Sequence, residues 1–230
     1  METALDKFTI ALAAFEQWNH TGICYKKQQV ETISTQLTKE LNHAFYYQLI
    51  QSSIVVAKTI SLTSPTGETN ELYTQGKGVS LLVENAVENN SIKALVAMLA
   101  AMLIAGNSVI ICSDSTAIKE LVTNINTKLN FPKGLLQQID TNCYQSLIEQ
   151  DIRNLAFIGK PTEAAKINQI LSIRPNAIVC LVAETDLTTL PNSRDPMLVL
   201  RFITEKVRTV NITAIGGNAM LLELGNTASL

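Results

Sequence analysis

The sequence predicts an α/β fold in which N-terminal helices precede a doubly wound parallel sheet and a C-terminal β-ribbon. Two patterns carry this prediction. Short apolar runs alternate with longer helical segments from Gly78 onward, and two alternating runs flank a glycine-containing corner near the C-terminus. We expect one compact body made of a helical segment with a turn at 1–76, a core at 77–190, and a short helix with the ribbon at 191–230.

Helices are predicted in the first third because apolar residues recur there every three or four positions. The first stripe is Leu5, Phe8, Leu12, Phe15 and Trp18, and the second is Val30, Ile33, Leu37 and Leu41. A third helix is expected near residues 45–57. The order of Pro65 and Gly67 in the following loop is typical of a tight turn.

The core is predicted from apolar runs that are too uniform for a sheet with one solvated face, so helices should cover both faces. The candidate strands are 79–83, 108–112, 135–139, 155–158 and 178–183. The candidate helices between them are 92–105, 116–129, 144–150 and 162–172. Beyond a loop at residues 191–193, Asp195 and Pro196 have the order of an N-cap and a first-turn proline, which predicts a short helix to Thr204.

The ribbon is predicted at residues 206–224. Val207, Thr209 and Asn211 alternate with Arg208, Val210 and Ile212, which is the two-residue period of a strand. Gly216, Gly217 and Asn218 supply the backbone freedom for a sharp bend.

Composition narrows the function classes. Hydrophobic residues make up 47% of the chain and charged residues 17%, a low charged share that indicates surface covered by a partner. The formal net charge of −2, with mixed signs along the chain, argues against nucleic-acid binding. The four cysteines form no Cys-x-x-Cys pair, so no metal site is expected and the thiols suit the cytoplasm. The apolar run at 94–105 is too short for a transmembrane helix, and the N-terminus lacks the features of a secretory signal.

The residues alone leave two other classes open. Cys112 at a strand end has the placement of an activated thiol, although free cysteines are usually buried and neither His20 nor His43 shares a motif with it. A free-standing dinucleotide-binding module would need a Gly-x-Gly-x-x-Gly loop, and the sequence contains none.

Segments along nearly the whole chain resemble, in order, the aldehyde dehydrogenase superfamily. They are Ala14–Trp18, Ser64–Leu72, Lys77–Val79, Ala105–Val109, Ala156–Gly159 and Leu181–Thr185. The stretch 206–224 resembles the C-terminal motif of long forms of proline utilization A, where it ends a non-catalytic domain with an aldehyde-dehydrogenase fold. The resemblance implies that the core is a degenerate Rossmann-like domain similar to the NAD domain of these enzymes.

The differences from the family bear on chemistry. The family's two ribose ligands match Cys112 and Ser115, and the small residue beneath its pyrophosphate matches Lys160, after Gly159 and before Pro161. Its oxyanion-hole asparagine matches Val87, and an apolar side chain cannot stabilise an oxyanion.

The family's general base matches Glu184, but Asp186 and Leu187 replace the two glycines that follow, and the domain with the nucleophilic cysteine is missing from the chain. We therefore expect Glu184 to be vestigial, with no catalytic residue, cofactor or metal in this chain.

The resemblance implies a structural role in a bifunctional or trifunctional oxidoreductase that converts proline to glutamate with FAD and NAD. The expected partner is the dehydrogenase domain of the same polypeptide or of its dimer mate, and the expected location is the cytoplasm or the periphery of the inner membrane. The alternatives are a degenerate NAD-binding module and a free-standing oxidoreductase fragment. The expected interface residues are Val207, Arg208, Val210, Asn211, Thr213, Gly216, Gly217, Asn218, Leu221 and Leu222.

Overall fold

The computed structural model of this chain describes residues 3–86 and 89–211. The chain forms two compact units. We call Met1–Ala57 with Gln75–Thr204 the body, and Lys58–Thr74 with Glu205–Leu230 the small unit.

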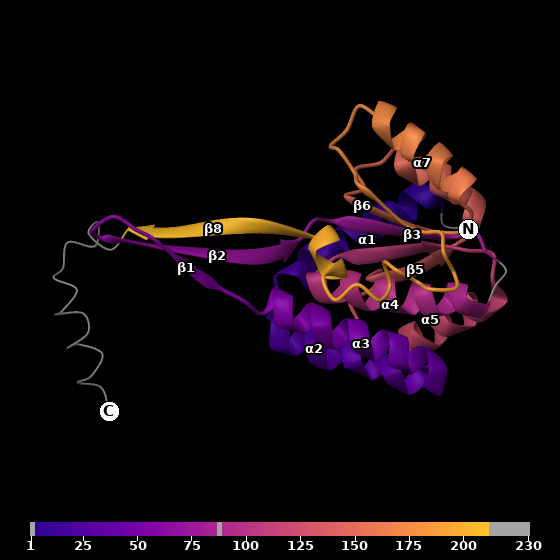
Figure 1. Ribbon diagram of the computed structural model, residues 1–230, viewed down its shortest axis with the longest axis horizontal. Helices are drawn as coiled ribbons and strands as arrows, with labels where there is room; N and C mark the ends of the chain where they lie inside the picture. The colour runs from indigo at the N-terminus through magenta and orange to yellow at the C-terminus, as the bar shows by residue number, and fades with distance from the viewer. Residues whose placement is uncertain (1–2, 87–88, 212–230) are drawn as a thin grey trace. The chain divides into compact units, whose positions relative to one another are not determined.

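The body is built on a parallel sheet, for which the described residues supply five strands in the order β5-β4-β3-β6-β7 (Figure 1). Their bounds are Val79–Glu84 (β3), Ser108–Cys112 (β4), Leu136–Ile139 (β5), Asn154–Ile158 (β6) and Leu181–Glu184 (β7). The chain first builds outward from β3 to β5 and then returns to the other side of β3. This reversal confirms the predicted doubly wound sheet and creates a switch point between β3 and β6.

Helices cover both faces of the sheet, as the apolar strands predict (Figure 1). On one face the packed helices are α3 (Lys39–Val56), α4 (Asn89–Ala105) and α5 (Thr116–Lys128), with α2 (Ile23–Glu31) beside α3 and α4. On the other face they are α1 (Ala4–Asn19), α6 (Tyr144–Ile148, preceded by the 3-10 turn η2, Thr141–Cys143) and α7 (Pro161–Ile173). Strand residues alternate between the two layers, with Leu82 facing α4 and Leu81 facing the α1 side.

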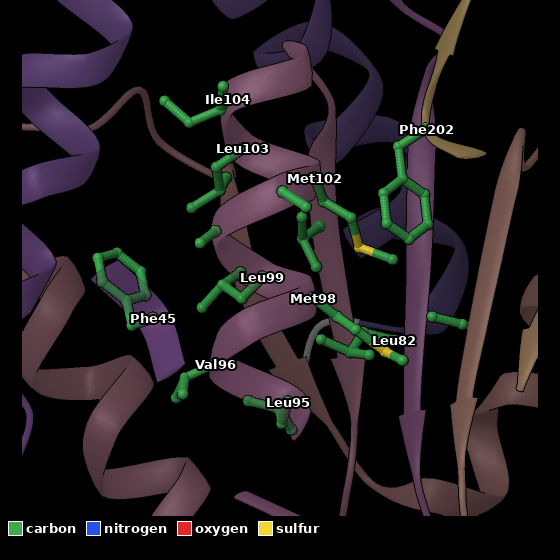
Figure 2. Close-up of a cluster of buried hydrophobic side chains, with 14 of the residues drawn as sticks. Phe45, Leu82, Leu95, Val96, Met98, Leu99, Met102, Leu103, Ile104 and Phe202 are labelled. Atoms are coloured by element: carbon green, nitrogen blue, oxygen red, sulfur yellow. The ribbon is translucent and has the colours of Figure 1, made fainter. Parts of the chain in front are cut away.

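Helix α4 is apolar all round because it is enclosed by other elements, and every residue from Ala94 to Ala105 is buried. Figure 2 shows Phe45 of α3 on one side of α4, and Leu82 of β3 and Phe202 on the other. Trp18 adds a polar anchor, since its indole Nε1 donates a hydrogen bond of 2.8 Å to the Leu103 carbonyl.

The N-terminal helices differ from the prediction after α1, and α3 spans Lys39–Val56 rather than residues 45–57. α1 begins as expected, with a capping box between Thr3 and Asp6. The second apolar stripe does not form one helix, because α2 gives way to the 3-10 turn η1 (Thr32–Gln36) and the chain is extended at Leu37 before α3. The hydroxyls of Thr32 and Thr35 donate to the carbonyls of Gln29 and Thr32, and such local bonds compete with a continuous helix.

Two further predictions need correction. Strand β7 begins at Leu181 rather than at 178, and Ile178 is 93% exposed. Leu181 pairs with Leu155 near the start of β6, so the preceding residues have no strand to pair with. The helix expected after Asp195 is only a 3-10 turn, η3 (Leu198–Arg201), because strand β8 starts at Ile203.

The small unit contains a small antiparallel sheet in the order β1-β2-β8, which the sequence analysis does not foresee between residues 58 and 76. The strands are Ile60–Leu62 (β1), Glu68–Gly76 (β2) and Ile203–Asn211 (β8). The tight turn between β1 and β2 is present: Glu68 N–H donates to the Pro65 carbonyl at 3.2 Å, and Gly67 has a φ of 90°.

Candidate functional site

A pocket of about 750 Å³ lies at the carboxyl ends of β3, β6 and β7, which is where doubly wound sheets bind ligands. We call it the switch-point pocket. It is lined by Asn85, Gly159, Lys160, Glu163 and Asp186, among others, and it contains the first turn of α7. Gly159 and Lys160 thus both line this pocket.

The chemistry of the switch-point pocket is poorly matched to a pyrophosphate. Lys160 is the N-cap of α7, Pro161 has no N–H, and the Glu163 N–H already donates to the Lys160 carbonyl at 3.1 Å. Glu163 and Asp186 line the switch-point pocket together with Lys160. Hydrogen bonds from the Thr189 side chain and backbone and from the Thr188 backbone lower the pKa of Asp186, which keeps its negative charge in place.

Gly159 is required by close packing. A Cβ atom there would lie 2.7 Å from Cζ of Phe157 and 3.2 Å from the Asn85 carbonyl oxygen. The neighbours of Gly159 therefore explain why a glycine stands at this position.

Cys112 and Ser115 do not reach the switch-point pocket. Cys112 ends β4 on the face covered by α1 and α6, where it is fully buried. Burial, with a smaller contribution from Cys143, raises the pKa of its thiol far above the usual range, so the reactive thiolate is suppressed. The interpretation of Cys112 as an activated nucleophile therefore lacks support. Ser115 is the N-cap residue of α5, and its N–H donates to Ser113 Oγ at 3.1 Å.

A buried carboxylate that the sequence pattern did not reveal lies close to Ser113. Glu84, the last residue of β3, is 5% exposed and accepts hydrogen bonds from Ser113 Oγ at 2.7 Å and Ser91 Oγ at 2.8 Å. These hydroxyls satisfy part of the hydrogen-bonding capacity of a charge that would be costly to bury alone. The signal in the sequence was a glutamate that directly continues an apolar strand.

Glu184 clamps a loop. Its side chain is fully buried on the α3–α4 side, and Oε2 accepts from the Ser193 N–H at 2.7 Å and from Ser193 Oγ at 2.8 Å. Gln48 of α3 holds the same loop, because its Nε2 donates to the carbonyls of Ser193 and Asp195 at 2.9 and 2.7 Å. Ser193 was not foreseen, since a serine in a polar loop gives no distinctive pattern.

The structure keeps Cys112 and Glu184 apart. They lie on opposite faces of the sheet. Cys112 packs on the face covered by α1. Glu184 is two residues after Val182 in β7, so both side chains point to the face covered by α4. Their strands, β4 and β7, are separated by β3 and β6. Three spacings of about 4.8 Å place those strands about 14 Å apart, beyond the reach of a thiol–carboxylate catalytic pair.

The described members of the predicted interface lie in β8 and are exposed. Val207 is 55% and Val210 43% exposed, Arg208 forms an ion pair with Glu71 of β2, and Asn211 ends β8. The other predicted interface residues, Thr213, Gly216, Gly217, Asn218, Leu221 and Leu222, lie outside the described residues, as does Val87.

Strand pairing gives the three-stranded sheet two unlike faces. Ile60 pairs with Leu72 and Leu62 with Asn70, so these four side chains lie on one face of the sheet. The Thr209 side chain hydrogen-bonds to that of Asn70 and lies on the same face. Val207, two residues before Thr209 in β8, lies there too. We call it the apolar face after its aliphatic residues, Ile60, Leu62, Leu72 and Val207; it also carries Asn70, Glu205 and Thr209. The opposite face carries Ser61, Glu71, Lys206, Arg208 and Val210.

Comparisons with known proteins support the fold. No family model matches the chain, and neither does any curated protein. Among solved structures, a variant of proline utilization A from Bradyrhizobium japonicum aligns with a TM-score of 0.66 and 24% identity, covering 82% of this chain and 23% of that one. Proline utilization A from Bdellovibrio bacteriovorus aligns with a TM-score of 0.66 and 14% identity, covering 80% and 23%. PnpE in complex with nicotinamide adenine dinucleotide gives 0.61 and 14%, covering 80% and 43%.

The chain has an aldehyde-dehydrogenase-like fold. This agrees with the fold that the sequence resemblance implies. The chain spans less than a quarter of the two proline utilization A chains and less than half of the PnpE chain.

The described residues contain neither a candidate membrane-spanning helix nor a candidate metal site. No helix in that part of the chain has the length and apolar character to span a membrane. Within residues 3–86 and 89–211, no group of three or more histidine, cysteine or acidic side chains could hold a metal ion.

Proposed function

We propose that this chain is a non-catalytic aldehyde-dehydrogenase-like domain of a larger proline-catabolic oxidoreductase. In this proposal it docks on the dehydrogenase domain of the same polypeptide or of its dimer mate. It stabilises that domain and helps to cover the channel that carries the intermediate between proline and glutamate. FAD and NAD belong to the parent enzyme, and the parent resides in the cytoplasm.

The observation that carries the proposal is the exposed three-stranded sheet. Ile60, Leu62 and Val207 of its apolar face are 50%, 38% and 55% exposed. An antiparallel sheet with one solvated face normally packs its apolar face against something, and an edge strand offers unpaired N–H and C=O groups to another strand. Docking by strand addition uses both features, since the backbone gives affinity and the alternating side chains give register.

The chemistry of the body supports a structural role. The Cys112 thiol is buried in the layer opposite Glu184, and Glu184 already accepts two hydrogen bonds that hold a loop. The switch-point pocket has two carboxylates and one lysine among the groups that line it, which disfavours a dinucleotide. The similarity to proline utilization A chains supports the choice of parent.

Titration calorimetry with NAD tests the non-catalytic part of this proposal. We expect no saturable binding in the micromolar range and no aldehyde-dependent formation of NADH. Lys160→Gln serves as the control, because Lys160 is the group in the switch-point pocket most able to hold a phosphate. Micromolar binding that Lys160→Gln weakens would favour a degenerate NAD-binding module instead.

A further inference from the structure

A second polar cavity lies at the edge of the body's sheet that β5 forms. It has a volume of about 450 Å³ and lies beside β5, the edge strand farthest from β7. Its walls come from α1, from α5 and from the loop at residues 131–134. We call it the β5-edge pocket.

Among the residues that the structure describes, the ionisable ones that line the β5-edge pocket are Lys7, Lys119 and Lys133, with no aspartate or glutamate beside them. This does not reflect the composition of the chain, whose formal net charge is −2. In the part of the chain that the structure describes, the amines of Lys119 and Lys133 have neither a hydrogen-bond nor an ion-pair partner. Two cations are therefore available to a ligand.

Side-chain amides fix the frame of this pocket. Asn126 of α5 donates to the Leu136 carbonyl of β5 at 3.0 Å, and Gln137 of β5 donates to the Lys7 carbonyl of α1 at 2.9 Å. These bonds tie both helices to the edge strand. Because the Asn126 side chain already donates to the Leu136 carbonyl, that carbonyl is less available to pair with an added strand. This edge of the sheet is therefore better suited to a small molecule.

The remaining lining adds an apolar floor. Ile10, Val122 and Phe131 line the β5-edge pocket together with the lysines. Pockets of this size, with apolar walls and a few convergent charges, suit small molecules. Lysines act as point charges and bind phosphate well, whereas planar carboxylates are recognised better by the fork of an arginine, which this pocket lacks.

We propose that the β5-edge pocket binds a small phosphorylated anion, with the phosphate between Lys119, Lys133 and Lys7 and the organic part on the apolar floor. The switch-point pocket is less suited to an anion, because Glu163 and Asp186 line it together with Lys160. The switch-point pocket lies at the carboxyl ends of β3, β6 and β7 and the β5-edge pocket beside β5, and they share no lining residue, so binding to one can be distinguished from binding to the other.

The test uses the intact protein and inorganic pyrophosphate as the probe, with calorimetry for affinity and amide chemical shifts for position. We expect saturable binding, with shifts at Gly134, Leu136 and Thr123. Lys119→Gln and Lys133→Gln should each weaken it about tenfold, the equivalent of one charge-assisted hydrogen bond. Lys160→Gln, which removes the same charge from the switch-point pocket, should leave the affinity unchanged.

Four outcomes would overturn the proposal: no saturable binding, shifts centred on Gly159, equal weakening by Lys160→Gln, or equally tight binding of malonate, a dicarboxylate without a phosphate. Unchanged amide spectra for Lys119→Gln and Lys133→Gln outside the pocket would establish that their effect is not a loss of fold.

Discussion

Glu184 holds a loop in this structure. It matches the general base of aldehyde dehydrogenases by resemblance, and in this structure its Oε2 holds the Ser193 N–H and hydroxyl. Its Oε1 is buried and has no hydrogen-bond partner among the described residues. Glu184 therefore binds the loop at Ser193, and its position does not by itself indicate proton transfer.

Substitutions of Glu184 separate these roles. Glu184→Gln keeps an oxygen acceptor for Ser193, so we expect full activity of the parent enzyme and a small change in stability. Glu184→Ala leaves the Ser193 N–H unpaired and should cost about 1–3 kcal/mol of unfolding free energy, measured by urea denaturation. A large fall in turnover for a folded Glu184→Gln protein would instead assign chemistry to this residue.

Lys26 is a buried basic residue, and it makes stability depend on pH. Its side chain is 6% exposed, and Nζ donates to the Asn19 carbonyl at 3.0 Å. Burial lowers the pKa of Lys26 from 10.5 to about 8. Because the unfolded chain then binds more protons between those two values, stability should rise with pH across that window. Below pH 8, keeping Lys26 charged costs roughly 3 kcal/mol.

The comparison that isolates this effect is Lys26→Met, which keeps the length of the side chain and removes the charge. We expect the variant to be more stable than the natural protein at about pH 7, with the difference shrinking toward about pH 10. Urea unfolding of both proteins at the two pH values measures it. A difference that stays constant with pH would mean that Lys26 is solvated in the folded protein.

At the scale of elements, strands were predictable where burial imposed a pattern. The runs that became β3, β4 and β6 are wholly buried, and their apolar residues indicated the bounds within one residue. Strands β1 and β2 were missed, because β1 is exposed and β2, with Glu-Thr-Asn-Glu-Leu-Tyr-Thr-Gln-Gly, has few apolar residues. Such strands depend on their partners, which a local pattern does not reveal.

The candidate site was predictable in part for a similar reason. The order of motifs placed Gly159 and Lys160 at the end of β6, because parallel strands present their carboxyl ends at one edge. That Cys112 and Glu184 face opposite layers depends on strand order and on the parity of each strand. Neither follows from spacing along the chain.

The apolar face of the three-stranded sheet gives a prediction with a matched control. Val207→Asp places a charge on the apolar face, whereas Val210→Asp places it on the opposite face of the same strand. If the apolar face docks, Val207→Asp should weaken binding to the parent's dehydrogenase domain about tenfold or more, since burying a valine is worth about 1.5 kcal/mol or more. Val210→Asp should have a much smaller effect. Biolayer interferometry with both variants decides the matter, and equal effects would contradict docking through this face.

At the scale of the whole molecule, the chain combines a doubly wound body with a small sheet that exposes aliphatic side chains. The body retains a doubly wound fold, while its switch-point pocket carries carboxylates where an anionic cofactor would need cations. The small unit exposes aliphatic side chains that burial would stabilise. This division of properties favours a domain that supports the chemistry of another domain.

The most direct test of this account removes residues 206–224 from the parent enzyme and measures two activities on the same preparation. Proline oxidation at the flavin reports on the rest of the enzyme, and the coupled conversion of proline to glutamate reports on the covered channel. We predict that the coupled conversion slows, or that more intermediate escapes to solvent, while proline oxidation is nearly unchanged. A truncated enzyme that channels as well as the intact one would contradict the covering role, and a parallel loss of both activities would point to misfolding instead.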